Sequence, residues 1–470
     1  MQFTGTYTDL YQLTMGQVYF LQGTGEKKAI FDYFFRKLPF EGGYAIFAGL
    51  EILLEVLENI RFNESDIEFL KKQSFNPEYI EYLKDFRFRG SVFSSMEGDI
   101  VFPIRPVLSV ESNLVEAQLI ETILLNLLNY QTLIATKASR IRKSAGKKIL
   151  IDFGMRRAQG QASYYASRAA IIGGFDSTSN VLAGKDFKVA ISGTMAHSYI
   201  QSFDDELTAF RYFSETRPEE CVLLVDTYNT LRSGLPNAIT IAKEMEARGH
   251  RLKGIRLDSG DLAYLARESR KILDKAGLYY VKIAASNQLD EFVIRSLLEQ
   301  GAPIDVFGVG TSLAVGQPDS ALDGVYKLAF ANDKPRIKLS ESPSKVNLPY
   351  KKQVHRLSDN TQQLLGADIV SLWDEKDLSI MHHPFNPIQN IRFSRFISEP
   401  LLHLVMKKGK RTVPAKSVQE IASYSAERVN QLPEEFKRFE YPHIYKIGLS
   451  NRLKEERDNL IASIKNAIQL

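Results

Sequence analysis

The stretch LKGIRLDSGDL (residues 252–262) contains one complete unit of the pattern that decides the fold. Its apolar run, Leu252 to Leu257, ends in polar residues and a glycine. An amphipathic segment then runs from Leu262 to Ala276, and Gly277 follows as a stop signal. A short apolar run of this kind predicts a buried strand, and the amphipathic segment predicts a helix. The stretch therefore predicts a strand, a polar turn and a helix in succession.

Similar apolar runs occur on both sides of this unit, at residues 149–151, 189–191, 222–225, 281–284 and 304–307. From residue 193 onward the predicted strand ends lie roughly 25 to 35 residues apart, the length of a strand plus a helix in a parallel α/β array. Because at least five units repeat and no Rossmann glycine fingerprint is present, we expect an α/β barrel. The wide interval between the first two runs predicts an extra element or an irregular closure.

The parts of the chain that flank this repeat have a different pattern. Residues 1–115 predict a mixed α/β domain, and residues 116–345 predict a linking helix followed by the barrel. Residues 346–470 are first strand-like and then helical, and no change of composition marks a linker before them. We therefore expect this last segment to pack back on the N-terminal domain.

Composition excludes several classes of protein. The chain has 470 residues and a formal net charge of +4, which gives no reason to expect a nucleic acid or a membrane surface as partner. Its one cysteine, Cys221, excludes an internal disulfide and a Cys–Cys zinc site. Neither a secretory signal nor an apolar run of about 18 residues is present. These features predict a cytoplasmic protein.

Polar residues gather where the predicted strands end, at 152–157, 193–198, 226–230, 256–261, 285–287 and 308–312. In a parallel array these ends share one face, so we expect their side chains to surround a single cavity. One aspartate alone is more often a helix cap, and Asp258 or Ser259 could cap the helix that follows. Because polar residues of this kind follow most of the predicted strands, a shared functional site is favoured over a set of separate helix caps.

The residue types at these ends predict the ligand. The run Gly308-x-Gly310-Thr311-Ser312 opens a predicted helix, so its backbone N–H groups could bind a phosphate, and Ser286-Asn287 could add donors. Planar guanidiniums that suit phosphate or carboxylate come from Arg36, Arg156, Arg157 and Arg256. Carboxylates that suit sugar hydroxyls, or Mg²⁺ on a polyphosphate, come from Asp226, Asp258 and Asp261. Together they predict a phosphorylated sugar and an anionic second substrate.

Eight motifs resemble those of one family, in the same order: TDLYQLTM (8–15), FRKLPFEGGY (35–44), FGMRRAQG (153–160), GGFDSTSNV (173–181), GTMAHS (193–198), DTYNT (226–230), RLDSGDL (256–262) and FGVGT (307–311). The chain resembles the nicotinate phosphoribosyltransferases, ATP-assisted enzymes of NAD salvage. The resemblance implies the type II phosphoribosyltransferase fold, which is an irregular α/β barrel plus a mixed α+β domain built from N- and C-terminal segments. It also implies a homodimer with composite active sites.

The resemblance assigns a role to each site residue. The pyridine ring of nicotinate would stack between Phe153 and Tyr11, with Tyr11 contributed by the partner subunit. Arg256 and the region of Thr194 would bind its carboxylate. The 5-phosphate of 5-phosphoribosyl 1-diphosphate would be bound by Ser286, Asn287, Gly308, Gly310 and Thr311.

The remaining assignments concern charge and phosphoryl transfer. Arg36 and Arg156 would face phosphates, and Asp226 and Asp258 would hold ribose hydroxyls or the Mg²⁺-bound diphosphate. His197 resembles the histidine that ATP phosphorylates in this family. The implied reaction is attack of the pyridine nitrogen on C1 of the ribose as diphosphate leaves, which gives nicotinate mononucleotide with coupled ATP hydrolysis.

Two related activities and one non-enzymatic function are alternatives. Asp176 stands where nicotinamide-using relatives carry a carboxylate that accepts the amide N–H, so nicotinamide phosphoribosyltransferase is the main alternative. The GTMAHS and RLDSGD motifs favour nicotinate. Quinolinate phosphoribosyltransferase would need a denser basic pocket. A barrel that serves only as a binding protein would have gaps among the site residues, and the sequence shows none.

Overall fold

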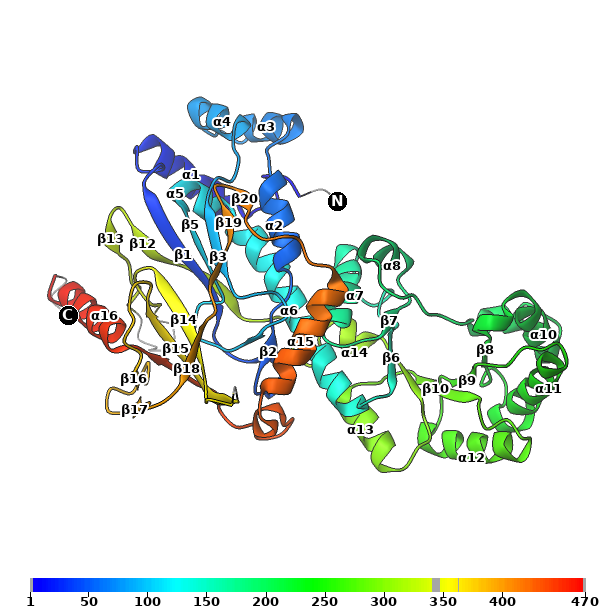
Figure 1. The fold of residues 1–470 in the computed structure, drawn as a ribbon. Helices are drawn as coiled ribbons and strands as arrows, with labels where there is room; N and C mark the ends of the chain where they lie inside the picture. Colours follow the sequence, from blue (N-terminus) through cyan, green and yellow to red (C-terminus); the bar gives the residue numbers. More distant parts are fainter. Residues whose placement is uncertain (1–2, 340–346, 362, 468–470) are drawn as a thin grey trace. The chain divides into compact units, whose positions relative to one another are not determined.

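The computed structural model describes residues 3–339, 347–361 and 363–467, and the chain divides into two units (Figure 1). One unit combines residues 1–136 with residues 321–470, and the other contains residues 137–320. The long helix α6 (Glu121–Ala145) contains residue 136, where the first segment ends.

The unit of residues 137–320 contains a six-stranded sheet in the order β7-β6-β11-β10-β9-β8, in which every neighbouring pair is parallel. Its strands are β6 (Ile149–Asp152), β7 (Ser177–Thr178), β8 (Val222–Leu224), β9 (Gly254–Leu257), β10 (Lys282–Ser286) and β11 (Val306–Val309). Among the described residues, the pairings run from β7 to β8 without joining these two edges. The parallel α/β class is confirmed.

The expected strand at 189–191 is wrong. Only Ile191 forms a single bridge, to Thr178, and the two-residue strand β7 occupies this edge of the sheet. The predicted extra element is present, because helices α7 (Gln161–Ile172) and α8 (Val181–Phe187) fill the interval after β6. The neighbouring strand β7 has two residues, so the run is held by the backbone hydrogen bonds that join Thr178 to Ala190 and Ser192 at 3.1 and 3.0 Å.

The other helices of this unit are α9 (His197–Gln201), α10 (Glu206–Thr216), α11 (Leu235–Ala247), α12 (Leu262–Lys275), α13 (Glu291–Glu299) and α14 (Thr311–Ala314). Asp261 caps α12, since its side chain accepts a hydrogen bond from the backbone N–H of Tyr264 at 3.0 Å. The expectation that Asp258 or Ser259 might be this cap is therefore wrong, and both residues remain available for other contacts.

The first unit contains a seven-stranded antiparallel sheet in the order β13-β12-β1-β5-β3-β19-β20. Its strands are β1 (Lys28–Phe35), β3 (Ser91–Ser94), β5 (Leu108–Asn113), β12 (Gly324–Ala331), β13 (Lys334–Pro335), β19 (His403–Lys407) and β20 (Lys410–Arg411). Strands β2 (Ala45–Ile46) and β4 (Ile100–Val101) pair separately.

A six-stranded mixed sheet of the same unit has the order β17-β16-β21-β15-β14-β18. Its strands are β14 (Lys352–Ser358), β15 (Leu364–Leu372), β16 (Ile380–His382), β17 (Asn390–Arg392), β18 (Ile397–Pro400) and β21 (Lys446–Leu449). The unit's helices are α1 (Leu10–Leu21), α2 (Leu50–Asn59), α3 (Glu64–Lys71), α4 (Pro77–Lys84), α5 (Leu114–Leu119), α15 (Val418–Gln431) and α16 (Asn451–Ala467).

Buried ion pairs join the N-terminal and C-terminal segments of this first unit. Arg356 on β14 contacts Asp99 at 2.8 Å and Asp368 on β15 at 3.2 Å, and all three side chains are almost fully buried. Arg428 on α15 contacts the same Asp99 at 2.7 Å, and Arg105 contacts Asp368 at 2.8 Å. Removing one partner of such a cluster would leave a buried charge without compensation.

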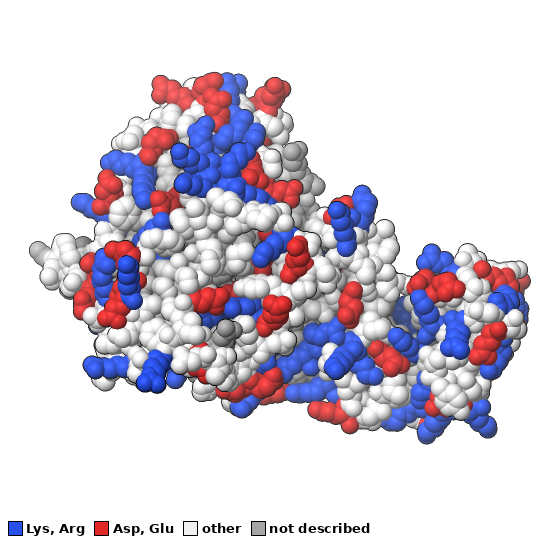
Figure 2. Space-filling view, in the orientation of Figure 1, with Lys and Arg blue, Asp and Glu red and all other residues white. Residues whose placement is uncertain are grey.

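Charged side chains of both signs are scattered among uncharged residues on the face of the molecule shown in Figure 2, in keeping with the small net charge. His382 and His383, which are adjacent in the sequence, each have a separate partner. Nε2 of His382 contacts Oδ1 of Asn451 at 3.1 Å, whereas Nδ1 of His383 accepts a hydrogen bond from the backbone N–H of Asn386 at 2.9 Å.

Within the described ranges, no helix is both long enough and apolar enough to cross a membrane.

Candidate active site

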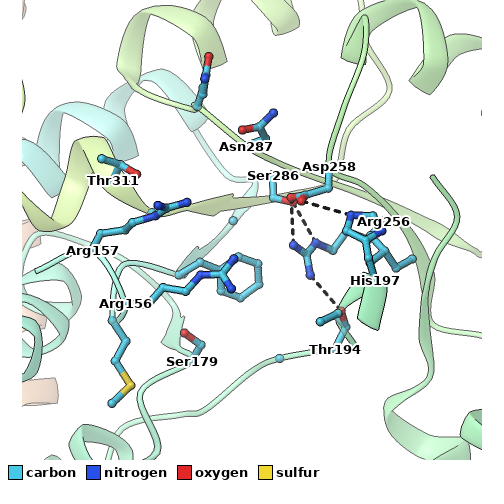
Figure 3. Close-up of a pocket in the computed structure, with 18 of the residues that line it drawn as sticks. Arg156, Arg157, Ser179, Thr194, His197, Arg256, Asp258, Ser286, Asn287 and Thr311 are labelled. Carbon is cyan, nitrogen blue, oxygen red and sulfur yellow. Dashed lines mark hydrogen bonds and ion pairs between the residues drawn. The ribbon is translucent and has the colours of Figure 1, made fainter. Parts of the chain in front are cut away.

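A cavity of about 980 Å³ lies at the carboxyl ends of the parallel strands of residues 137–320 (Figure 3). Eleven predicted site residues line it: Phe153, Arg156, Thr194, His197, Arg256, Asp258, Ser286, Asn287, Gly308, Gly310 and Thr311. These residues follow or end strands β6, β9, β10 and β11, or belong to the GTMAHS segment. The structure brings this set of residues together at one cavity.

Arg256, near the end of β9, connects several walls of the cavity. Its Nε donates a hydrogen bond to the Ser286 hydroxyl at 2.9 Å, and its Nη2 contacts the Asp258 carboxylate at 3.0 Å. Its Nη1 donates to the Thr194 hydroxyl and to the Met195 carbonyl, both at 3.3 Å. The side chain is 15% exposed, so these contacts hold the guanidinium in one orientation at the cavity wall.

The carboxylate of Asp258 is shared between Arg256, Ser286 and His197. The Ser286 hydroxyl donates a short hydrogen bond to its Oδ1. Partial burial alone would raise the pKa of the Asp258 carboxyl, but the Ser286 hydrogen bond and the Arg256 charge outweigh burial and hold that pKa below its ordinary value. Asp258 is therefore an anion at neutral pH.

His197 is the first residue of α9 and lies at the rim of the cavity. Its Nε2 is 3.7 Å from Oδ2 of Asp258, and its Nδ1 is 3.0 Å from the hydroxyl of Thr227. The side chain is 39% exposed. The imidazole is thus oriented by the contact of Nδ1 with Thr227, while Nε2 faces the Asp258 carboxylate and the ring stays accessible from the cavity.

The ring of Phe153 forms part of the cavity wall beside Arg256. The Cζ atom of Arg256 lies 5.3 Å from the ring centroid, which is a cation–π distance. A Cβ atom built on Gly308 would lie 2.3 Å from Cε2 of this ring. Glycine at this position therefore makes room for the Phe153 ring, a steric reason that differs from the expected close approach of a phosphate.

Asp226 does not line the cavity but supports one of its walls. Its Oδ2 accepts hydrogen bonds from the backbone N–H of Asp258 at 2.8 Å and from the Ser259 hydroxyl at 2.7 Å. Its Oδ1 is buried and has no hydrogen-bond partner among the described residues. One carboxylate oxygen thus remains available to a group that the protein itself does not supply.

Other parts of the cavity wall carry hydroxyl groups, backbone turns and cations. Asn287, at the end of β10, adopts a left-handed conformation (φ 83°), and Thr311 begins the four-residue helix α14. Arg156 and Arg157 follow β6, and in Figure 3 both side chains extend toward the middle of the cavity. The ion pairs recorded for the described part of the chain include none for either arginine. This part of the cavity wall therefore suits an anion.

Besides Asp226, four predicted site residues lie outside this lining, and one of them, Asp261, caps α12 instead of facing a ligand. The Asp176 carboxylate forms an ion pair with Arg142 and accepts a hydrogen bond from the backbone N–H of Leu150 at 2.7 Å. Tyr11, on α1, and Arg36, directly after β1, belong to the other unit. Tyr11 is half exposed, and Nη1 of Arg36 is 3.9 Å from Asp323.

The structure adds residues to which sequence reasoning gave no role. Ser179, Gln288, Asp290 and Gln317 line the cavity, and Thr227 contacts His197 from behind. Ser179 and Thr227 lie inside the quoted motifs GGFDSTSNV and DTYNT, so the motifs could have identified them as site residues. The other three lie outside every motif, and only the fold brings them to the cavity.

The fold resembles those of solved structures, and this resemblance defines the class of protein. The fold matches the crystal structure of human nicotinic acid phosphoribosyltransferase with a TM-score of 0.87 and 32% identity, covering 96% of this chain and 99% of that chain. A nicotinate-nucleotide pyrophosphorylase structure from Pyrococcus furiosus matches with a TM-score of 0.72 and 26% identity, covering 91% of this chain and 95% of that one. The molecule therefore has the fold of the type II phosphoribosyltransferases.

Three family models match successive parts of the sequence. They are the nicotinate phosphoribosyltransferase N-terminal domain (residues 6–129), the nicotinate phosphoribosyltransferase family (149–377) and its C-terminal domain (351–457). A nicotinate phosphoribosyltransferase of Bacillus subtilis is 45% identical over 98% of this chain and 96% of its own length. One of Caenorhabditis elegans is 36% identical over 95% of this chain and 91% of its own length. The chain belongs to the nicotinate phosphoribosyltransferase family.

Proposed function

We propose that this protein makes nicotinate mononucleotide and diphosphate from nicotinate and 5-phosphoribosyl 1-diphosphate, the first step of NAD salvage from nicotinate. The observation that carries the proposal is the contact between the Arg256 guanidinium and the face of the Phe153 ring. A flat ring that bears a carboxylate needs an aromatic face and a fixed guanidinium side by side. Family membership and the names of the relatives agree with this substrate.

The phosphate groups of the second substrate fit the hydroxyl groups, the backbone turn and the arginine of the cavity wall. The Ser286 and Thr311 hydroxyls and the turn at Gly310 would bind the 5-phosphate, while Arg156 would stabilise the negative charge that grows on the departing diphosphate. The pyridine nitrogen attacks C1 of the ribose, the C1–O bond breaks, and diphosphate leaves. Fixed cations favour this step because charge develops where they already stand.

Mg²⁺ is the expected cofactor, and the carboxylates present fit it. The buried, unpartnered Oδ1 of Asp226 is an oxygen ligand of the kind that Mg²⁺ prefers, and Asp258 lies beside it. No group of three or more candidate metal-binding side chains occurs among the described residues, which suits an ion shared with the diphosphate. When bound, Mg²⁺ would neutralise charge on the diphosphate.

His197 would couple ATP to this reaction. In the proposed step the imidazole attacks the γ-phosphorus of ATP, ADP leaves, and the phosphohistidine is later hydrolysed to phosphate. Its exposure at the cavity rim supports the proposal, as does its position between Asp258 and Thr227. A phosphohistidine at this rim would strengthen the binding of the diphosphate substrate and drive the equilibrium toward the nucleotide.

The position of Asp176 supports nicotinate over nicotinamide as substrate. Its carboxylate is bound by Arg142 and by a backbone N–H, and it is absent from the cavity lining. It therefore gives no repulsion against a substrate carboxylate. Tyr11 and Arg36 would complete the site in a cytoplasmic homodimer, with Tyr11 of one subunit stacking on the substrate ring in the other.

The test measures formation of nicotinate mononucleotide from nicotinate or nicotinamide, with and without ATP, for the wild type and His197→Ala. We expect nicotinate to be the better substrate. We also expect ATP to lower the KM for 5-phosphoribosyl 1-diphosphate in the wild type but not in the variant. A preference for nicotinamide would overturn the substrate assignment. An absence of any ATP effect in the wild type would overturn the phosphohistidine role.

A further inference from the structure

A buried polar network lies directly behind the cavity, around Asp152. This residue ends β6, and its side chain was one of the strand-end groups expected to face the site. The structure shows it 1% exposed and absent from the cavity lining. The Asp152 carboxylate therefore points into the protein interior, next to residues that do line the cavity.

Three neutral groups hold the carboxylate of Asp152. Its Oδ1 accepts a hydrogen bond from the backbone N–H of Gly154 at 2.7 Å. Its Oδ2 accepts hydrogen bonds from the hydroxyls of Ser167 and Thr178, both at 2.7 Å. The ion pairs recorded within the described ranges include none to Asp152, so these donors alone compensate a buried charge.

The same network continues through Asn180. The Asn180 side chain donates to the Ser167 hydroxyl at 3.3 Å, and its backbone N–H donates to the Thr178 hydroxyl at 3.0 Å. Ser167, Thr178 and Asn180 are at most 1% exposed. The network thus joins the end of β6 to α7, to β7 and to the start of α8.

Two parts of the cavity wall are joined to this network by hydrogen bonds. The Gly154 N–H bond shapes the turn that carries the Phe153 ring, and the backbone N–H of Ser179 bonds the carbonyl of Asp152 at 2.8 Å. Phe153 and Ser179 both line the cavity. A buried network in which every donor has a partner is rigid, and the loss of one acceptor leaves the others unsatisfied.

We propose that Asp152 is a positioning residue that fixes the Phe153 ring and the Ser179 wall, and so sets the affinity for the pyridine base. The proposal rests on the function proposed above, in which Phe153 stacks on nicotinate. Asp152 does not touch the substrate. We expect its effect to fall mainly on the base, because Ser286 on the 5-phosphate side is held by Arg256 and Asp258 and not by this network. Strand β11 meets the end of β6 through the backbone pairing of Val309 with Asp152, which the side-chain variant leaves in place.

The variant Asp152→Asn keeps the size of the side chain but places an NH₂ group against a donor. We expect the KM for nicotinate to rise about tenfold, the scale of a small misplacement of a binding group, while the KM for 5-phosphoribosyl 1-diphosphate changes little. Thr178→Val removes one donor to the carboxylate without adding a clash, and should shift the same KM in the same direction by less.

The matched control is Asp305→Asn on the neighbouring strand. Asp305 also accepts a backbone hydrogen bond, from the Ile283 N–H at 3.0 Å, but it lies at the opposite end of the sheet, before β11. This variant should leave both KM values unchanged. Equal rises in both KM values for Asp152→Asn, or a rise for Asp305→Asn as large as that for Asp152→Asn, would overturn the proposal.

The failure of this proposal is distinguishable from the failure of the proposed function. If the wild type does not convert nicotinate, the function itself is wrong. If the wild type converts nicotinate and folded Asp152→Asn has an unchanged KM for it, only the positioning role is wrong. Thermal unfolding of each variant confirms that the comparison is made on folded protein, and Thr178→Val supplies the same test should Asp152→Asn not fold.

Discussion

The guanidinium of Arg256 lies over the Phe153 ring, with 5.3 Å between its Cζ and the ring centroid, while its Nη2 contacts Asp258 at 3.0 Å. Arg256 lies near the end of β9 and Phe153 follows β6, so the contact reaches across the strands between them. Each group limits the movement of the other, and together they form the surface proposed for nicotinate.

We predict that Arg256→Lys lowers activity strongly without unfolding the protein. A lysine ammonium cannot replace the planar fork that contacts Ser286, Thr194 and Asp258 together. The loss should be about 1.5–3 kcal/mol of transition-state stabilisation, or roughly 10- to 150-fold in kcat/KM for nicotinate. Arg267→Lys on α12, outside the cavity lining, is the control. An Arg256→Lys enzyme within about threefold of the wild type would contradict the assignment.

Gly308→Ala should displace the Phe153 ring. The new Cβ would lie 2.3 Å from the ring, and overpacking of this kind costs typically about 1–3 kcal/mol. We expect a lower melting temperature and weaker nicotinate binding, measured by scanning calorimetry and isothermal titration. Gly193→Ala is the control for the melting temperature alone, because a Cβ there meets no protein atom within 4 Å, although Gly193 also lines the cavity. Equal behaviour of the two variants would show that Phe153 yields freely.

Asp368→Asn should destabilise the first unit. The carboxylate receives Arg105 at 2.8 Å, Arg356 at 3.2 Å and the Tyr445 hydroxyl at 2.7 Å, all buried. Breaking one partner of a buried ion cluster costs about 3–5 kcal/mol of unfolding free energy. Urea denaturation checks this, and the fluorescence of Trp373, the single tryptophan, reports on this unit. Glu81→Gln, which removes the exposed pair with Lys84 in the same unit, should cost at most about 1 kcal/mol.

The Cys221 thiol should not react in the native protein. It is fully buried, and burial raises the pKa of this thiol to about 12, so almost no thiolate exists at neutral pH. Titration with a thiol reagent at mildly alkaline pH should detect no thiol in the folded protein and one per chain after unfolding in guanidinium. Rapid labelling of the native protein would contradict this placement.

Stability should depend on pH through Asp152. Burial raises the pKa of its carboxyl above the ordinary value of 3.8, although the bonds from Ser167, Thr178 and Gly154 lower it. A carboxyl with a raised pKa in the folded state stabilises folding fully below its unfolded pKa, and this stabilisation is lost as the pH rises through the folded pKa. The wild type should therefore gain stability relative to Asp152→Asn as the pH falls from about 7 to about 4. A constant difference across this range would contradict the raised pKa.

Much of the fold and part of the site followed from local patterns. Apolar runs of three to six residues followed by amphipathic segments predict the parallel strands, because burial on both faces of such a sheet demands continuous apolar sequence. The strand ends then place Arg256, Asp258 and Ser286 together. The run at 189–191 misled this reasoning, since an apolar run does not reveal that the strand beside it, β7, has two residues.

The sequence alone determined the parallel α/β class, the family motifs and the residue types at the strand ends, because these depend on periodicity and on side-chain chemistry. Only the tertiary structure decided which polar groups face the cavity. It turned Asp152 inward, paired Asp176 with Arg142 and gave the capping role to Asp261 instead of Asp258. Side-chain direction depends on partners distant in the sequence, and a buried carboxylate turns to wherever the folded chain provides its donors.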